Sequence, residues 1–193
     1  LTSIAIVLMH GYRYPAHEQR LAEIAAEIGF TQISTSHDVS ALIKLIGRGD
    51  TTLADAYLSP VLHHYVRQFI GQLGEGADPQ FMKSSGGLAA ASAFHGRDAI
   101  LSGPAGGIVG MVGSAAPLGK DRLISFDMGG TSTDVSHYAG RLERDNETIV
   151  AGTRIRAPML RIHTVAAGGG SICRCDGARV LVGPESAGAN PGP

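Results

Sequence analysis

The sequence predicts an α/β protein of 193 residues, with ordinary helices and strands at the front and glycine-rich turns behind them. Three observations support this prediction. An apolar run, an amphipathic stretch and a second apolar run follow one another over residues 4–34, a β-α-β pattern that favours a parallel strand pair. Apolar residues keep helical spacing over residues 52–73. Of the 27 glycines, 22 lie after residue 73, which indicates tight turns and close backbone approaches there.

Composition narrows the classes of function. Hydrophobic residues make up 44% of the chain and charged residues 17%, as in a globular protein with a buried core. A net charge of −1 argues against a nucleic-acid binder that relies on phosphate attraction. No apolar run reaches the roughly 18 residues that a membrane span needs. No secretion signal is evident, so we expect a cytoplasmic protein without membrane or nucleic-acid partners.

The first half of the chain predicts two strands and two helices. Residues 4–9 form the first strand, and a helix begins at Pro15 and stops at Gly29, a natural left-handed terminator. Residues 30–34 form the second strand. A long helix over residues 52–73 follows, capped by Asp50-Thr51 and interrupted by Pro60. Arg48, just before it, is interpreted either as a solvated arginine or as a polar contact for a site.

The second half predicts shorter elements: a linker over 75–79, a strand over 81–84, an alanine-rich helix ending near 94, a strand over 99–101, a helix over 103–117, a polar exposed stretch over 142–150, a strand over 159–166 and a hairpin over 172–182. Glycines in the 103–117 helix cost about 1 kcal/mol each relative to alanine. We therefore expect compensation, from close packing along Gly110 and Gly113 and from an anionic ligand at residues 103–107.

Residues 123–136 read as a β-hairpin that turns through Gly129-Gly130. Asp127 and Asp134 bracket this turn, and Thr131, Ser132 and Thr133 add hydroxyl donors. Glycines let backbone amides approach an anion, and carboxylates can hold the Mg²⁺ that accompanies a nucleotide. The pattern fits a phosphate cradle, and it also fits a surface hairpin with a Gly-Gly turn.

The two cysteines, Cys173 and Cys175, share one face of a predicted strand. Neighbouring positions on one strand are poorly placed for a disulfide, and two thiols alone do not make a structural zinc site. Free thiols are the prediction, with a metal site that includes His163 as the alternative.

Several blocks, in this order, resemble the hydantoinase/oxoprolinase family, within the superfamily of actin, sugar-kinase and heat-shock-chaperone ATPases. They are Thr51-Thr52, Ala56-Tyr57-Leu58, Pro60-Val61, Ser85-Gly86-Gly87-Leu88, Ser102-Gly103-Pro104-Ala105-Gly106-Gly107, Asp127–Asp134, His163-Thr164, Gly168-Gly169-Gly170-Ser171, Gly183–Ala189 and Pro191-Gly192-Pro193. They cover the chain from about residue 50 to its end.

The resemblance implies ribonuclease-H-like, actin-like ATPase lobes, each a mixed sheet flanked by helices. Residues 1–48 would be the tail of a first lobe, 49–79 a connecting helix and linker, and 80–193 a second lobe, incomplete at its C-terminus. The chain would then be an internal fragment, inactive alone, because a second Asp-x-Gly-Gly-Thr hairpin is absent from it.

The implied activity is ATP-dependent hydrolysis of a cyclic amide, a hydantoin or 5-oxoproline, through phosphorylation of the amide oxygen. ATP and Mg²⁺ would be the cofactors, and Asp127 and Asp134 the catalytic and metal-binding residues. The nucleotide-binding residues would be Gly129, Gly130, Thr131, Ser132, Thr133, Gly103, Gly106, Gly107, Gly168, Gly169, Gly170 and Ser171. A partner hydrolase subunit or domain and an oligomer are expected as well. Three alternatives stay open: a non-catalytic ATP-binding module, a subunit-interaction module and a related ATP-dependent ketone carboxylase.

Overall fold

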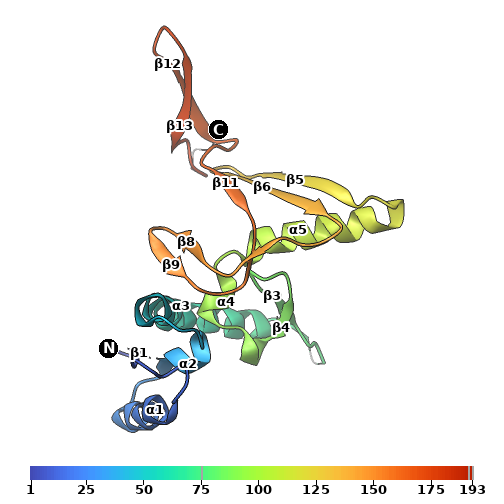
Figure 1. The fold of residues 1–193 in the computed structure, drawn as a ribbon. Helices are drawn as coiled ribbons and strands as arrows, with labels where there is room; N and C mark the ends of the chain where they lie inside the picture. Colours follow the sequence, from blue (N-terminus) through green and yellow to red (C-terminus); the bar gives the residue numbers. More distant parts are fainter. Residues whose placement is uncertain (75, 191, 193) are drawn as a thin grey trace. The chain divides into compact units, whose positions relative to one another are not determined.

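The computed structural model describes residues 1–74, 76–190 and 192, so residue 75 at the start of the predicted linker and residues 191 and 193 of the last block lie outside the described residues. Helices and strands are mixed along the chain, which confirms the α/β class (Figure 1). Within the described part, the strands pair in small sheets of two or three strands, not in one mixed sheet. The chain divides into two compact units, residues 1–102 with 144–159 and residues 103–143 with 160–193.

The first unit opens with the predicted β-α-β arrangement. Strand β1 (Ser3–Ile6) pairs in parallel with β2 (Gln32–Thr35), and helix α1 (Ala16–Ile28) connects them. Gly29 ends α1 with φ of 106°, and its amide donates back to the carbonyl of Ala25. Both the parallel pair and the glycine stop are therefore confirmed.

A short helix α2 (Ser36–Val39) precedes the long helix α3 (Leu45–Gly71), which contains Pro60 as predicted. The predicted start of α3, at residue 52, is wrong. The hydroxyls of Thr51 and Thr52 donate to the carbonyls of Gly47 and Arg48, one turn earlier, at 2.9 and 2.8 Å. These threonines lie inside the helix with their hydroxyls satisfied by its own backbone, so they do not cap it.

Strand β3 (Gln80–Met82) is followed by β4 (Leu88–Ala90) and the 3₁₀ turn η1 (Ala91–Ala93), so the predicted alanine-rich helix is wrong. The reason is a turn at Gly86, whose φ of 83° suits glycine and whose amide donates to the carbonyl of Lys83. This turn folds the alanine-rich segment back onto β3 as an antiparallel strand.

The predicted strand over residues 99–101 is also wrong, because helix α4 (Gly96–Ala99) occupies its start. Two side chains of α3 accept hydrogen bonds from the first amides of α4. Ser59 Oγ accepts from the Gly96 amide at 3.0 Å, and Asp55 Oδ1 accepts from the Arg97 amide at 3.1 Å. These partners come from a helix about 40 residues earlier, and they satisfy donors that a helix start otherwise leaves unpaired.

The polar stretch after residue 142 forms strands β7 (Arg144–Asp145), β8 (Thr148–Val150) and β9 (Thr153–Ile155), and β10 (Met159–Leu160) follows. Strands β8 and β9 form a hairpin through Ala151 and Gly152, which both have positive φ, as a type I′ turn requires. Residues of this hairpin and of α3 line an open, mostly apolar pocket of about 920 Å³.

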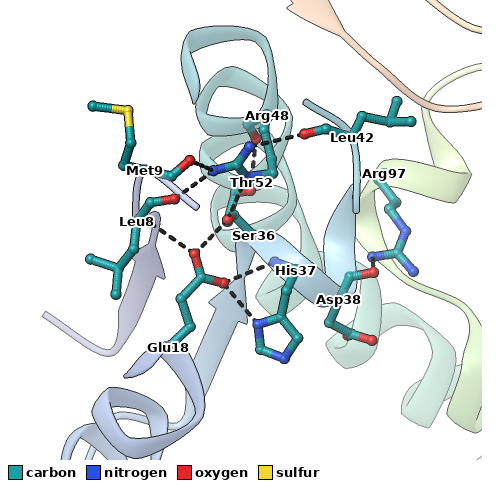
Figure 2. A network of polar contacts seen from close by, with 10 residues as sticks. All are labelled: Leu8, Met9, Glu18, Ser36, His37, Asp38, Leu42, Arg48, Thr52 and Arg97. Atoms are coloured by element: carbon teal, nitrogen blue, oxygen red, sulfur yellow. Dashed lines mark hydrogen bonds and ion pairs between the residues drawn. The ribbon is translucent and has the colours of Figure 1, made fainter. Parts of the chain in front are cut away.

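Two fully buried charged residues, Glu18 of α1 and Arg48 of α3, organise a polar network next to β1 and β2 (Figure 2). Ser36 links them, because its hydroxyl donates to Glu18 Oε1 at 2.6 Å and accepts from Arg48 Nε at 2.8 Å. The remaining partners are the Leu8 amide and the amide and ring of His37 for Glu18, and the carbonyls of Leu8, Met9 and Leu42 for Arg48. Arg48 is therefore buried and hydrogen-bonded inside the first unit, so its interpretation as a solvated arginine is wrong, while its interpretation as a polar contact for a site stays a prediction.

Acid is expected to weaken the first unit through Glu18. Burial raises the pKa of this carboxyl, but hydrogen bonds from Ser36, the Leu8 amide and His37 outweigh that effect and hold the pKa below its usual value. The ionised form therefore stabilises the fold above the unfolded-state pKa of about 4.3, and this contribution is lost as pH falls through the lower folded-state pKa. Glu18→Gln should lower the free energy of unfolding by about 1–3 kcal/mol at pH 7.

Urea unfolding measured from pH 7 down to pH 3 tests this expectation. Glu18→Gln should show a flatter decline in stability with falling pH than the wild type. The exposed Glu23→Gln variant is the matched control. Equal slopes for the wild type and Glu18→Gln would contradict the assignment, since the other ionisable neighbours, His37 and Arg48, remain in both proteins.

The second unit contains most of helix α5 (Ser102–Ala115), the 3₁₀ turn η2 (Ala116–Leu118) and strands β5 (Arg122–Met128), β6 (Thr133–Ala139), β11 (His163–Val165), β12 (Ser171–Cys175) and β13 (Val180–Ser186). Strands β11, β6 and β5 form an antiparallel sheet, and β12 and β13 form a separate hairpin. The predicted α5 and both hairpins are confirmed, whereas the predicted strand over 159–166 is divided into β10 and β11.

The structure also tests the predicted packing of the α5 glycines and the predicted state of the two cysteines. A Cβ added at Gly110 or Gly113 would meet no atom of the described residues within 4 Å, so the expected close packing along α5 is absent there. Cys173 and Cys175 are exposed free thiols.

Of the helices in the described ranges, none has the length and apolar character to span a membrane.

Candidate functional site

The two carboxylates singled out in the sequence lie side by side on the β5–β6 hairpin. Asp127 and Asp134 are directly paired in the antiparallel register, so their side chains extend from the same face of the sheet. Side chains paired in this way have Cβ atoms about 4.5–5.5 Å apart, and like charges there repel each other. A cation held between the two carboxylates would offset this repulsion.

The third strand extends this row. Thr164 of β11 pairs with Asp134 of β6, and its hydroxyl donates to Asp134 Oδ1 at 2.6 Å. Two residues along the hairpin, Ser125 and Ser136 pair on the same face, with their hydroxyl oxygens 2.7 Å apart. One face of the sheet thus presents hydroxyls and carboxylates in adjacent rows.

Helix α5 borders this polar face. A pocket of about 330 Å³ is lined by Asp127 and Asp134 together with Pro104, Gly107, Ile108 and Met111 of α5 and with Ile124, Ser125, Phe126 and Ile162. A Cβ on Gly107 would lie 3.6 Å from Asp127 Oδ2, so a larger side chain at this position would crowd the carboxylate. Of the three predicted glycines of this helix, the structure brings Gly107 to the pocket, while Gly103 and Gly106 are not among the described lining residues.

The second glycine loop, residues 168–171, packs against the tip of the hairpin. The amides of Gly169 and Gly170 donate to the carbonyls of Gly129 and Gly130 at 2.9 and 2.7 Å. At the base of the tip, Thr133 Oγ1 donates to the carbonyl of Ala167 at 2.6 Å. In this structure these two amides of the loop bind the hairpin tip.

Residue Ser171 closes the same loop, since its hydroxyl accepts from the Gly168 amide at 2.9 Å and its own amide donates to the Gly168 carbonyl at 3.0 Å. A Cβ on Gly168 would lie only 2.6–2.7 Å from backbone atoms of Gly129, Gly130 and Thr131. The glycine at 168 is thus needed for close approach of two backbones.

Three consecutive amides of the tip, those of Gly130, Thr131 and Ser132, have no acceptor anywhere in the described part of the chain. Gly130 and Thr131 are exposed. Adjacent backbone donors of this kind form anion-binding concavities, and carboxylate oxygens are the ligands that Mg²⁺ prefers. The donor set at the tip and the acceptor pair beside it therefore fit a phosphate–Mg²⁺ group.

Sequence reasoning found the hairpin and its two carboxylates, and the structure brings residues 129–133 together with 168–171 as one feature. Sequence reasoning missed Thr164 and the Ser125–Ser136 pair. Their contacts depend on which residues face each other across β11, β6 and β5, and this register is visible only once the strands are paired.

Comparison with known proteins agrees with the resemblance seen in the sequence. A family model described as Hydantoinase/oxoprolinase matches residues 48–193. The chain is 48% identical over 197 residues to a 5-oxoprolinase of Saccharomyces cerevisiae, covering 100% of this chain and 15% of that protein. It is 38% identical to the caprolactamase subunit alpha of Pseudomonas jessenii, covering 99% of this chain and 29% of that subunit.

Two solved structures are similar over nearly the whole chain. The ATP-dependent caprolactamase of Pseudomonas jessenii superposes with a TM-score of 0.77 at 36% identity, over 98% of this chain and 29% of that one. A nucleotide-free acetone carboxylase, described as catalysing ATP-dependent acetone carboxylation, superposes with a TM-score of 0.78 at 28% identity, over 97% of this chain and 28% of that one. The chain spans about one sixth of the length of the 5-oxoprolinases that it matches.

Proposed function

Because the chain belongs to the hydantoinase/oxoprolinase family, we propose that it forms the nucleotide-binding part of an enzyme that opens a cyclic amide in an ATP-dependent reaction. The observation that carries this proposal is the β5–β6 hairpin, where Asp127 and Asp134 face each other beside three unpaired amides of the described structure. The named relatives act with ATP or on cyclic amides, and the activity belongs to the complete protein.

The residues of the hairpin suit phosphoryl transfer, where positioning and charge neutralisation do most of the catalytic work. ATP–Mg²⁺, when bound, would supply a phosphoryl group to the amide oxygen with release of ADP, and would so make that oxygen a leaving group. Gly130, Thr131 and Ser132 would donate their amides to phosphate oxygens. Asp127 and Asp134 would hold the cation and fix the phosphoryl group beside the amide.

The remaining predicted residues would complete the nucleotide site. Gly129, Thr133 and the loop Gly168-Gly169-Gly170-Ser171 would keep the tip in shape, which their mutual hydrogen bonds support. Gly107 would leave room for the nucleotide beside Asp127, with Gly103 and Gly106 at the start of the same helix. We also propose ribonuclease-H-like, actin-like lobes, with boundaries near residues 48 and 79, and a partner subunit, as the name of the caprolactamase relative suggests.

Substrate-dependent phosphate release tests the proposal. The complete protein is incubated with ATP and Mg²⁺ and with 5-oxoproline, hydantoin or caprolactam in turn, and phosphate and the ring-opened acid are both measured. We expect one cyclic amide to stimulate both products in equal amounts. Nucleotide binding without any stimulated release would support a non-catalytic module.

A carboxylase is the second candidate, because the acetone carboxylase structure superposes as well as the caprolactamase. The same assay with acetone and labelled bicarbonate distinguishes the two. Label fixed in an acid-stable product would assign carboxylation, whereas ring opening without fixed label would assign hydrolysis.

Gly130→Val is expected to abolish ATP-dependent turnover and to change thermal stability little. A Cβ at Gly130 would meet no atom of the described residues within 4 Å, so the fold has room for the side chain. The valine side chain would instead occupy space that a phosphate bound to the tip amides needs. Gly71→Val, at another open position, is the control, and near-normal turnover in Gly130→Val would contradict the phosphate assignment.

A further inference from the structure

We propose that Thr164 is a positioning residue, which fixes the carboxylate of Asp134 so that this group presents its free oxygen to a divalent cation. The inference rests on the proposed function, since it concerns the same candidate cation site. It assigns a role to a residue for which neither the sequence pattern nor the comparisons provide one.

The contact is specific in geometry. Thr164 and Asp134 are direct partners across β11 and β6, and Thr164 Oγ1 donates to Oδ1 of the carboxylate at 2.6 Å. A hydroxyl has one hydrogen to donate, whereas an ionised carboxylate has two oxygens and about four acceptor positions. The bond therefore restrains one oxygen of Asp134 and leaves the other, Oδ2, available.

The two carboxylates of the pair differ in this respect. In the ranges that the structure describes, no group donates a hydrogen bond to Asp127, although it faces Asp134 directly. Asp134 is thus the restrained member of the pair and Asp127 the freer one. A restrained ligand oxygen loses less freedom when a cation binds, which is why hydrogen-bonded partners of metal ligands raise affinity.

A role in fold stability explains the contact less well. Thr164 is exposed, and a hydrogen bond contributes only about 0.5–1.5 kcal/mol to folding even in favourable settings. Removing a group that is hydrogen-bonded to a metal ligand, in contrast, typically lowers metal affinity or activity by about 10–100-fold. Cation affinity is therefore the quantity that should respond to its removal.

The experiment compares Thr164→Val, which keeps the β-branched shape and removes the hydroxyl, with Thr164→Ser, which keeps the hydroxyl. Mn²⁺ is titrated into the complete protein in the presence of ADP, and bound Mn²⁺ is measured by electron paramagnetic resonance. We expect Thr164→Val to bind Mn²⁺ about 10–100-fold more weakly, and Thr164→Ser to bind it as the wild type does. Half-saturating Mg²⁺ in the turnover assay should rise in parallel, with the rate restored at high Mg²⁺.

Two controls make the outcome decisive. Thr31→Val removes another exposed threonine hydroxyl, which donates to the Thr2 carbonyl at 3.2 Å in the first unit, and it should leave Mn²⁺ binding unchanged. Thr164→Ala replaces Thr164→Val if thermal melting shows the latter to be unfolded. Wild-type Mn²⁺ affinity in the variant without the hydroxyl, or equal weakening in Thr164→Ser, would overturn the inference.

Asp134→Asn in the same titration separates this inference from the proposed function. If Asp134→Asn weakens Mn²⁺ binding and the loss of the Thr164 hydroxyl does not, the cation site stands and Thr164 has no part in it. If Asp134→Asn binds Mn²⁺ like the wild type, the cation site itself is wrong, and the inference fails with it.

Discussion

Asp127→Asn and Asp134→Asn are each expected to lower ATP-dependent turnover of the complete protein by about 10³-fold or more, in a protein that stays folded. A thousandfold loss corresponds to about 4 kcal/mol of transition-state stabilisation, which is the scale of removing one charge from a metal-ion site. The loss should appear in the rate, measured as phosphate released per enzyme at saturating ATP.

The melting temperature of these two variants, in contrast, should stay the same or rise. Like charges directly opposite each other on neighbouring strands destabilise a sheet, by about 0.2–1 kcal/mol. Neutralising either member of the Asp127–Asp134 pair therefore keeps the melting temperature or raises it. Asp121→Asn, at an exposed aspartate just before β5, is the matched control and should change neither quantity. Turnover retained by both hairpin variants would remove the carboxylates from the mechanism.

The elements that the sequence predicted well are those specified by local chemistry. The stop at Gly29 needs only a residue that accepts φ of 106°, and the hairpin at Asp127–Asp134 needs only alternating residues around a glycine turn. The Asp176 turn between β12 and β13 is similar, because Asp176 Oδ1 accepts from the amides of Ala178 and Arg179 nearby. Periodicity and turn residues are sufficient in these places.

Two of the errors in secondary structure have different causes, a distant hydrogen-bond partner in one case and a nearby glycine turn in the other. Helix α4 replaces a predicted strand because Ser59 and Asp55 of α3 accept hydrogen bonds from its first amides. Alanine favours helices, yet residues 88–90 form a strand because the Gly86 turn folds them onto β3. The α4 partners lie about 40 residues away, outside any local window. The Gly86 turn is local, but helix propensity alone does not reveal it.

In the candidate site, too, the sequence predicted residue types well and contacts between distant segments poorly. The sequence identified Asp127, Asp134 and the glycines, because their residue types alone suggest phosphate and cation chemistry. It could not show that the amides of Gly169 and Gly170 hold the hairpin tip, or that Thr164 contacts Asp134. Both contacts join segments that lie about 30–40 residues apart, so the strand register had to be seen first.

Gly168→Ala is expected to lower turnover by about 10²-fold, because it forces the hairpin tip away from its position. The added Cβ would lie 2.6 Å from the Gly129 carbonyl oxygen and 2.7 Å from Gly130 C and Thr131 N. All three are backbone atoms, so no side chain can rotate away, and either the tip or the loop has to move. A displacement of about 1 Å in a reacting group is enough for a loss of this size.

The same substitution should destabilise the second unit by about 1–3 kcal/mol, the usual cost of inserting a methyl group into a well-packed region. Gly169→Ala is the graded comparison, since its Cβ would meet only the Gly129 carbonyl oxygen, at 3.8 Å, and it should lose less turnover and less stability. Gly113→Ala lies in open space inside α5, where alanine favours the helix, and it should leave both quantities intact. Turnover and urea unfolding are measured for all three variants. If Gly168→Ala behaves like Gly113→Ala, the loop does not hold the tip, and the phosphate amides must be positioned by something other than the Gly168–Gly170 backbone.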